Sequence, residues 1–127
     1  MSGIRRIGSG GLFEAKIGYC RAVVAGGLIH VAGTTAQGND VPEDVVDQCK
    51  SALDTIEAAL SDAGAGFCDV IRVRYIVPDP DDFAPCWPIL KAAFGANPPA
   101  ATMMSCALID PRYKIEIEVT ALQPPSA

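Results

Sequence analysis

Histidine is almost missing from this sequence, and the histidine and cysteine residues do not have the spacing of metal ligands. His30 is the single histidine, and the five cysteines contain no CxxC pair. A structural zinc site needs about four closely spaced histidine or cysteine ligands. The glycine clusters at residues 8–11 and 26–27 lack the lysine of a phosphate-binding loop and the spacing of a dinucleotide-binding loop. We therefore expect no metal ion, no organic cofactor and reduced cysteines.

Excess positive charge and long hydrophobic runs are lacking as well. The net charge is −5 and aromatic residues make up only 6% of the chain. Nucleic-acid binding relies on positive charge and aromatic stacking, so we expect no nucleic-acid partner. The longest nearly unbroken apolar run, residues 22–29, is far shorter than the roughly 18–20 residues of a membrane span. Glycines, and no apolar core, follow the basic residues near the N-terminus, so we expect no secretory signal, no membrane partner and a cytoplasmic location.

Hydrophobic residues, by contrast, are plentiful. They make up 50% of the 127 residues. This length suits one domain spanning residues 1–127, whose fold buries roughly two thirds of the unfolded surface. The hydrophobic content exceeds what a soluble monomer of this size needs. Part of the apolar surface is therefore expected in a subunit interface.

Residues 41–63 have the periodicity of a long amphipathic helix. Apolar residues recur there every three to four positions, and charged residues occupy the other faces. Asp40, with Glu43 three residues later, is predicted to cap this helix. Gly64 or Gly66 is predicted to end it.

A second helical stripe is formed by the apolar residues at positions 83, 87, 90 and 94. Asp81 or Asp82 is the expected cap, and Gly95 the expected end. Pro88 lacks a backbone donor, so it fits this helix only if the helix starts late.

The remaining segments alternate with the period of β-strands. Residues 22–25 and 28–32 flank two glycines and predict a hairpin. Residues 70–77 predict a central strand. Residues 102–109 and 113–122 predict a closing antiparallel hairpin, turned at residues 110–112. This order indicates an α+β fold with two helices on one face of a mostly antiparallel or mixed sheet.

Several ordered motifs resemble one known family over essentially the whole chain. They are GYCRAV at residues 18–23, IHVAGTTA at 29–36, DVIRVRYIV at 69–77, PAAT at 99–102, LIDP at 108–111 and IEIE at 115–118. The sequence is similar to RidA-type proteins, the YjgF-like reactive-intermediate deaminase superfamily. The resemblance implies a chorismate-mutase-like fold and a homotrimer that binds small molecules in clefts between subunits.

The resemblance also implies a set of site residues. In deaminating members, a tyrosine, backbone groups near a glycine and a late glutamate surround the reacting carbon, and these positions match Tyr19, Gly33 and Glu116. The arginine of the family's PAR(S/T) motif grips the substrate carboxylate, and here its position holds Ala101. Arg21 could replace that cation if residues 19–21 are extended, because it would then share the face of Tyr19. Met103 is expected to line the cleft.

Other interpretations of these residues stay open at this point. Glu116 and Glu118 share one strand face and could simply pair with Arg72 and Arg74 across strands. Tyr19 could be an ordinary packing residue, and Gly33 could allow a bulge or a close backbone approach. The lone histidine is better explained as a sheet residue than as a catalyst.

Two main functions follow from this pattern. The first is hydrolysis of a small imine, enamine or related carbonyl compound, with Glu116 positioning the water and ammonia as a product. The second is a non-catalytic metabolite-binding or regulatory trimer that lost deaminase activity with the arginine. Ribonuclease activity, a label that some members of the resembling family carry, fits the acidic charge poorly.

Overall fold

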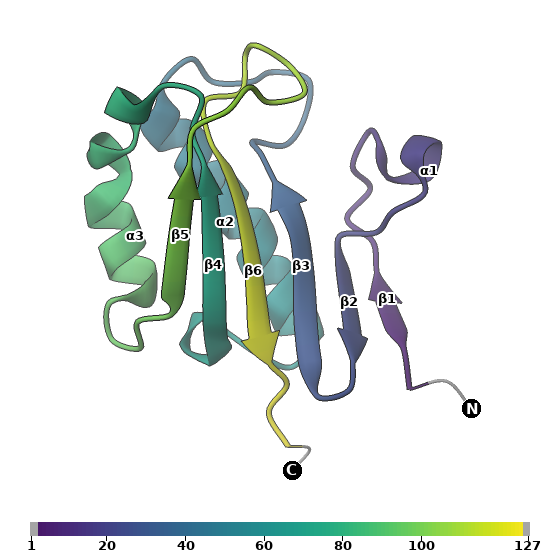
Figure 1. Cartoon of the computed structure of the whole chain (residues 1–127). Coiled ribbons are helices and arrows are strands. Elements are labelled where there is room, and N and C mark those ends of the chain that lie inside the picture. Colours follow the sequence, from purple (N-terminus) through teal and green to yellow (C-terminus); the bar gives the residue numbers. More distant parts are fainter. Residues whose placement is uncertain (1–2, 126–127) are drawn as a thin grey trace.

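The computed structural model describes residues 3–125, and every strand in that part of the chain belongs to one six-stranded sheet of order β1-β2-β3-β6-β4-β5 (Figure 1). The strands are β1 (Arg5–Ile7), β2 (Ala22–Ala25), β3 (Leu28–Thr34), β4 (Val70–Ile76), β5 (Ala100–Met104) and β6 (Glu116–Leu122). All neighbouring strands are antiparallel except β4 and β5, which are parallel. The α+β fold with a mixed sheet is therefore as predicted.

The helix α2 (Val45–Asp62) confirms the long amphipathic helix and corrects its start. Its buried residues recur every three to four positions, and Gly64 follows its end in the left-handed conformation, with φ +79°. The cap is Asp44, whose carboxylate accepts a hydrogen bond from the N–H of Val46 at 2.7 Å. The predicted cap at Asp40 was wrong, because the chain reaches its first helical turn only after Asp44.

The second predicted helix starts late, as its proline requires. The helix α3 is Trp87–Phe94, and Pro88 lies in its first turn, where no backbone donor is needed. Two 3-10 turns precede it, η2 (Pro80–Asp82) and η3 (Ala84–Cys86). The predicted cap at Asp81 or Asp82 was wrong, since Asp79 accepts from the N–H of Asp81 and caps η2. Gly95 ends α3 as expected.

The early hairpin is confirmed, but the closing hairpin is wrong. Gly26 and Gly27, with φ of +59° and +79°, form the tight turn between β2 and β3. Strand β5 pairs with β4, whereas β6 lies between β3 and β4. The turn at Asp110 is real, with the N–H of Tyr113 donating to its carbonyl at 3.1 Å. It closes a loop between strands that are not neighbours.

One hydrophobic core lies against one face of the sheet. The helices α2 and α3 both contribute buried side chains to it, together with the alternate residues Ile117, Val119 and Ala121 of β6. In Figure 1, α2 crosses behind the sheet and α3 stands beside β5. The N-terminal segment adds β1 and the short helix α1 (Glu14–Ile17), neither of which the sequence pattern predicted. In the described part of the chain, no helix is both long and apolar enough to cross a bilayer.

Candidate functional site

A cavity of about 570 Å³ brings together Tyr19, Arg21, Gly33 and Glu116, four of the residues that the sequence singled out. Its walls come from the N-terminal loop and α1, from the end of β3 and the segment after it, and from the loop before β6. Its rim carries the exposed apolar side chains of Leu12, Ile17 and Ile109.

Gly33 and Glu116 lie against each other at this cavity. The register between β3 and β6 shifts between Val31 and Thr34, so the backbone is irregular at Gly33. A Cβ atom placed on Gly33 would lie 2.8 Å from Oε2 and 2.9 Å from Cδ of Glu116. The absence of a side chain at Gly33 therefore lets the Glu116 carboxylate approach the β3 backbone closely. This agrees with the prediction that Gly33 permits a bulge or a close backbone approach.

Glu116 differs from its neighbour Glu118 in its surroundings. Glu118 pairs with Arg74 of β4 at 3.4 Å, which confirms the cross-strand interpretation for that residue. Glu116 stands opposite Ile76, and it forms no ion pair with any described residue. Burial raises the pKa of Glu116, the negative charge of Glu118 raises it further, and the charge of Arg21 opposes this shift. A carboxylate with a raised pKa is a better proton acceptor for a bound water.

Arg21 lies beside Tyr19, as predicted, but its guanidinium is buried. Its carbon Cζ is 5.6 Å from the centre of the Tyr19 ring, and the residue is only 2% exposed. The guanidinium donates to oxygen atoms of the surrounding chain: the carbonyl of Gly33 at 2.9 Å, Oγ1 of Thr34 at 3.0 Å, Oγ of Ser9 at 3.2 Å and the hydroxyl of Tyr19 at 3.4 Å. Arg21 thus ties the tyrosine, the glycine and the N-terminal loop together.

Glu14 is a site residue that the sequence analysis missed. Its carboxylate is buried and accepts from Ser9 Oγ at 2.6 Å, from the N–H of Gly11 at 2.7 Å and from the N–H of Ser9 at 3.1 Å. Burial alone would raise the pKa of Glu14, but these hydrogen bonds and the nearby charge of Arg21 hold it below its ordinary value. The glycine cluster thus binds an anion from its own chain. The available signal was a glycine-rich stretch of backbone amides three to five residues before an acidic residue.

Ala101 and Met103 lie elsewhere. Both are exposed on β5, at the sheet edge opposite to β1 (Figure 1). Met103 lines a separate hollow of about 200 Å³ with Val77 and Phe83. Neither residue lines the cavity at Glu116. A single chain therefore brings together Tyr19, Gly33 and Glu116. Ala101, which stands where deaminating members of the family carry arginine, lies on the edge strand β5.

The histidine and the cysteines lie outside the cavity. His30 is exposed on the sheet face away from the helices, with Nδ1 3.5 Å from Oγ1 of Thr120. Cys49 and Cys86 are buried in the core, where the hydrogen bond with Cys86 and burial raise the pKa of the Cys49 thiol. Among the described residues, no group of three or more His, Cys, Asp or Glu side chains could hold a metal ion.

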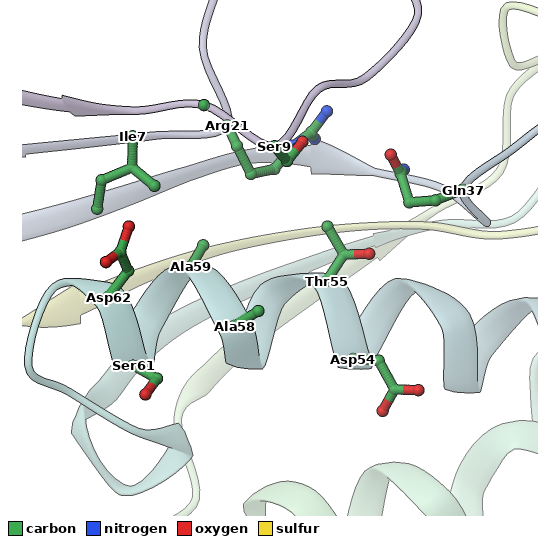
Figure 2. A pocket seen from close by; sticks show the side chains of 11 residues that line it. Ile7, Ser9, Arg21, Gln37, Asp54, Thr55, Ala58, Ala59, Ser61 and Asp62 are labelled. Atoms are coloured by element: carbon green, nitrogen blue, oxygen red, sulfur yellow. The ribbon is translucent and has the colours of Figure 1, made fainter.

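A larger cavity of about 770 Å³ lies between α2 and the N-terminal strands. Figure 2 shows Arg21 and Ser9 on one side of it and Thr55 and Ala58 of α2 on the other. Arg21 is the one residue that the sequence singled out here, and its guanidinium is held by the contacts described above. Asp62 of α2 pairs with Arg5 at 3.4 Å. The chemistry therefore favours the cavity at Glu116 as the candidate site.

Comparisons with known proteins agree with this architecture. The family model described as Endoribonuclease L-PSP matches residues 12–123. The 2-iminobutanoate/2-iminopropanoate deaminase of Capra hircus is 32% identical over 127 residues, which cover 96% of this chain and 93% of the relative. An uncharacterized protein of Streptomyces coelicolor is 34% identical, covering 93% of this chain and 91% of the relative.

A solved structure agrees over the same extent. It is that of the Mycobacterium tuberculosis protein Rv2704, described as a member of the YjgF/YER057c/UK114 family, with a TM-score of 0.86 and 39% identity over 94% of this chain and 98% of that chain. Family model, relatives and structure all span nearly the whole sequence. The chain belongs to the Endoribonuclease L-PSP family, which is the RidA/YjgF family.

Proposed function

We propose that this protein hydrolyses a small imine or enamine to a carbonyl compound and ammonia. The observation that carries the proposal is the Glu116 carboxylate, which lies against Gly33 in the cavity beside Tyr19 and has a raised pKa. Relatives at about 32% identity that are named 2-iminobutanoate/2-iminopropanoate deaminase support the same chemistry.

The reaction needs only water and a residue that moves protons. An enamine first tautomerises to its imine by moving a proton from nitrogen to carbon. The water oxygen adds to the carbon of the C=N bond, and the electron pair of that bond moves to nitrogen. Glu116 takes a proton from the water and returns it to the nitrogen, giving a carbinolamine. The C–N bond then breaks as the hydroxyl proton passes through Glu116 to the leaving nitrogen, so imine and water become carbonyl and ammonia.

We further propose that the cleft is completed by a second copy of the chain in a homotrimer. The cavity at Glu116 and the edge strand β5 each expose apolar side chains, at Leu12, Ile17 and Ile109 on one side and at Met103 and Met104 on the other. Pairing these surfaces would bury them and would bring Ala101 to the cavity of a neighbour. Light scattering in solution should give three times the mass of one chain, whereas the mass of one chain would contradict this assembly.

The role of Glu116 is tested by comparing Glu116→Ala and Glu116→Gln with the wild type. Imines are generated in place by an amino-acid oxidase or an amine oxidase, and the release of carbonyl product and ammonia is followed. Both variants should lose at least about 100-fold in rate, the usual effect of a general base. Glu57→Gln on the exposed face of α2 is the matched control and should keep full activity. Unchanged turnover in Glu116→Ala would remove the assigned role.

A second candidate function is binding without turnover, and Ala101 is the observation that favours it. Without the arginine at this position, a carboxylated imino acid has lost the bidentate partner that orients it. A ligand that binds at Glu116 while no imine is hydrolysed would support a metabolite-binding or regulatory protein.

The family model's name mentions ribonuclease activity, and the net charge of −5 makes RNA an unfavourable partner for this chain.

A further inference from the structure

The Arg21 guanidinium, the cation that lines the Glu116 cavity, is already held by contacts within the chain. Its nitrogens donate to Ser9, Gly33, Thr34 and Tyr19, and the side chain is only 3% exposed. A ligand carboxylate that takes the Nη1 hydrogens of this guanidinium would have to displace the Gly33 carbonyl or the Thr34 hydroxyl. The Gly33 carbonyl would then lose its charged donor, which is unfavourable, and the Thr34 hydroxyl would keep only its hydrogen bond to the Ala32 carbonyl.

The charge of Arg21 is also balanced. The Glu14 carboxylate lies 3.8 Å from it and is fixed by Ser9 and Gly11. Arg112 lies between Ile109 and Tyr113, which line the cavity, and it donates to the Asp110 carboxylate through Nε and Nη2, each at 3.1 Å, and to the Asn39 carbonyl. Among the described residues that line the cavity, Glu116 therefore supplies the net charge, which is negative.

The other half of the proposed cleft is uncharged. Ala101 and Met103 are register partners of Val73 and Tyr75 on β4. Because side chains alternate along a strand, Arg72 and Arg74 point to the opposite sheet face. There Arg72 donates to Thr102 and Arg74 pairs with Glu118. The hollow beside Met103 is lined by apolar side chains and one serine.

From these charges we infer that the substrate carries no carboxylate. It is a neutral imine or enamine, or the protonated iminium, with an apolar substituent, of the kind formed when an amine rather than an amino acid is oxidised. The inference rests on the proposed function and names its substrate class. A cationic iminium would face Glu116, whereas a carboxylate would meet that negative charge, and Arg21, the cation lining the described cavity, is already paired with Glu14.

Binding of two carbonyl products that differ in one group tests this substrate class. The probes are 4-methylpentan-2-one and 4-methyl-2-oxopentanoate, which have the same branched chain and carry either a methyl group or a carboxylate on the carbonyl. We expect the ketone to bind the wild type at least about tenfold more tightly in an NMR titration. Equal or tighter binding of the keto acid, or no binding of either probe, would overturn the inference.

Variants at residue 101 provide the control. Ala101→Arg should reverse the preference towards the keto acid, and Ala101→Leu, which adds size without charge, should keep the preference for the ketone. The site is exposed on an edge strand, so both proteins should fold. Turnover of imines made from leucine and from 3-methylbutylamine separates the two proposals. Hydrolysis of the amine-derived imine alone supports both, whereas a ketone preference without any turnover removes the proposed hydrolysis and leaves the ligand class standing.

Discussion

The Arg21 guanidinium lies 3.8 Å from the Glu14 carboxylate, and only 3% and 10% of the two side chains are exposed. The N-terminal loop wraps the carboxylate through Ser9 and Gly11, and Arg21 in turn holds the Gly33 carbonyl. The pair therefore links the N-terminal segment to the strand that carries the candidate site. Its contribution to stability depends on Glu14 being ionised.

We predict that Glu14→Gln lowers the free energy of unfolding at pH 7 by about 1–3 kcal/mol, because Arg21 is left buried without its counter-charge. The pKa of Glu14 is held below its ordinary value of 4.5 in the folded protein. Its stabilising effect is therefore complete above the unfolded pKa and is lost as the pH falls through the folded pKa. Urea unfolding from pH 7 to pH 3 should show the difference between the two proteins shrinking on acidification. A difference that stays constant would contradict this origin.

Gly33→Ala should impair the site more than the fold. The new methyl group would lie 2.8 Å from Oε2 of Glu116, at the end of a flexible side chain that can move. We expect a loss of at least about tenfold in turnover or ligand affinity, with a change of less than about 1 kcal/mol in stability. Gly66→Ala is the matched control, because a Cβ atom there meets no other atom within 4 Å and its φ of −144° suits alanine. Equal effects of the two substitutions on the site would refute the role of close approach.

The sequence predicted those elements whose signals are local. The period of α2 and the two glycines of the β2–β3 turn are both visible within a few residues. The closing hairpin failed because turn residues at 110–112 indicate a reversal but not which strands pair. Strand β6 is buried between β3 and β4 through Ile117 and Val119, a pairing set by residues far away in the sequence.

Only part of the candidate site could be predicted from the sequence, because some of its contacts join residues that are far apart along the chain. Tyr19, Gly33 and Glu116 share one cavity, as the resemblance implied. The position of Arg21 beside Tyr19 was predicted. Its hydrogen bond to the Gly33 carbonyl and its ion pair with Glu14 join separate segments, and periodicity does not reveal such contacts. The glycine cluster lacked phosphate-loop spacing, and the structure shows that its amides bind Glu14, a carboxylate three to five residues further along the chain.

The corrected helix cap can be tested directly. Asp44→Ala removes the acceptor of the Val46 N–H at 2.7 Å and should lower the free energy of unfolding by about 1 kcal/mol. Asp40→Ala should leave stability within about 0.5 kcal/mol, because that residue lies in the loop before the helix. Chemical denaturation of both variants with the wild type distinguishes the two caps. A larger loss from Asp40→Ala would restore the cap that the sequence favoured.

The pH dependence of turnover should carry the signature of Glu116. Burial and the charge of Glu118 raise the pKa of Glu116 above its ordinary value of 4.5. Because the ionised form accepts the proton from water, kcat/KM should rise with pH through that elevated pKa. Glu118→Gln removes one of the charges that raise it, so the rising limb should move to lower pH, while the exposed control Glu57→Gln should leave it in place. A limb that does not move in Glu118→Gln, or that persists unchanged in Glu116→Gln, would assign the titration to another group.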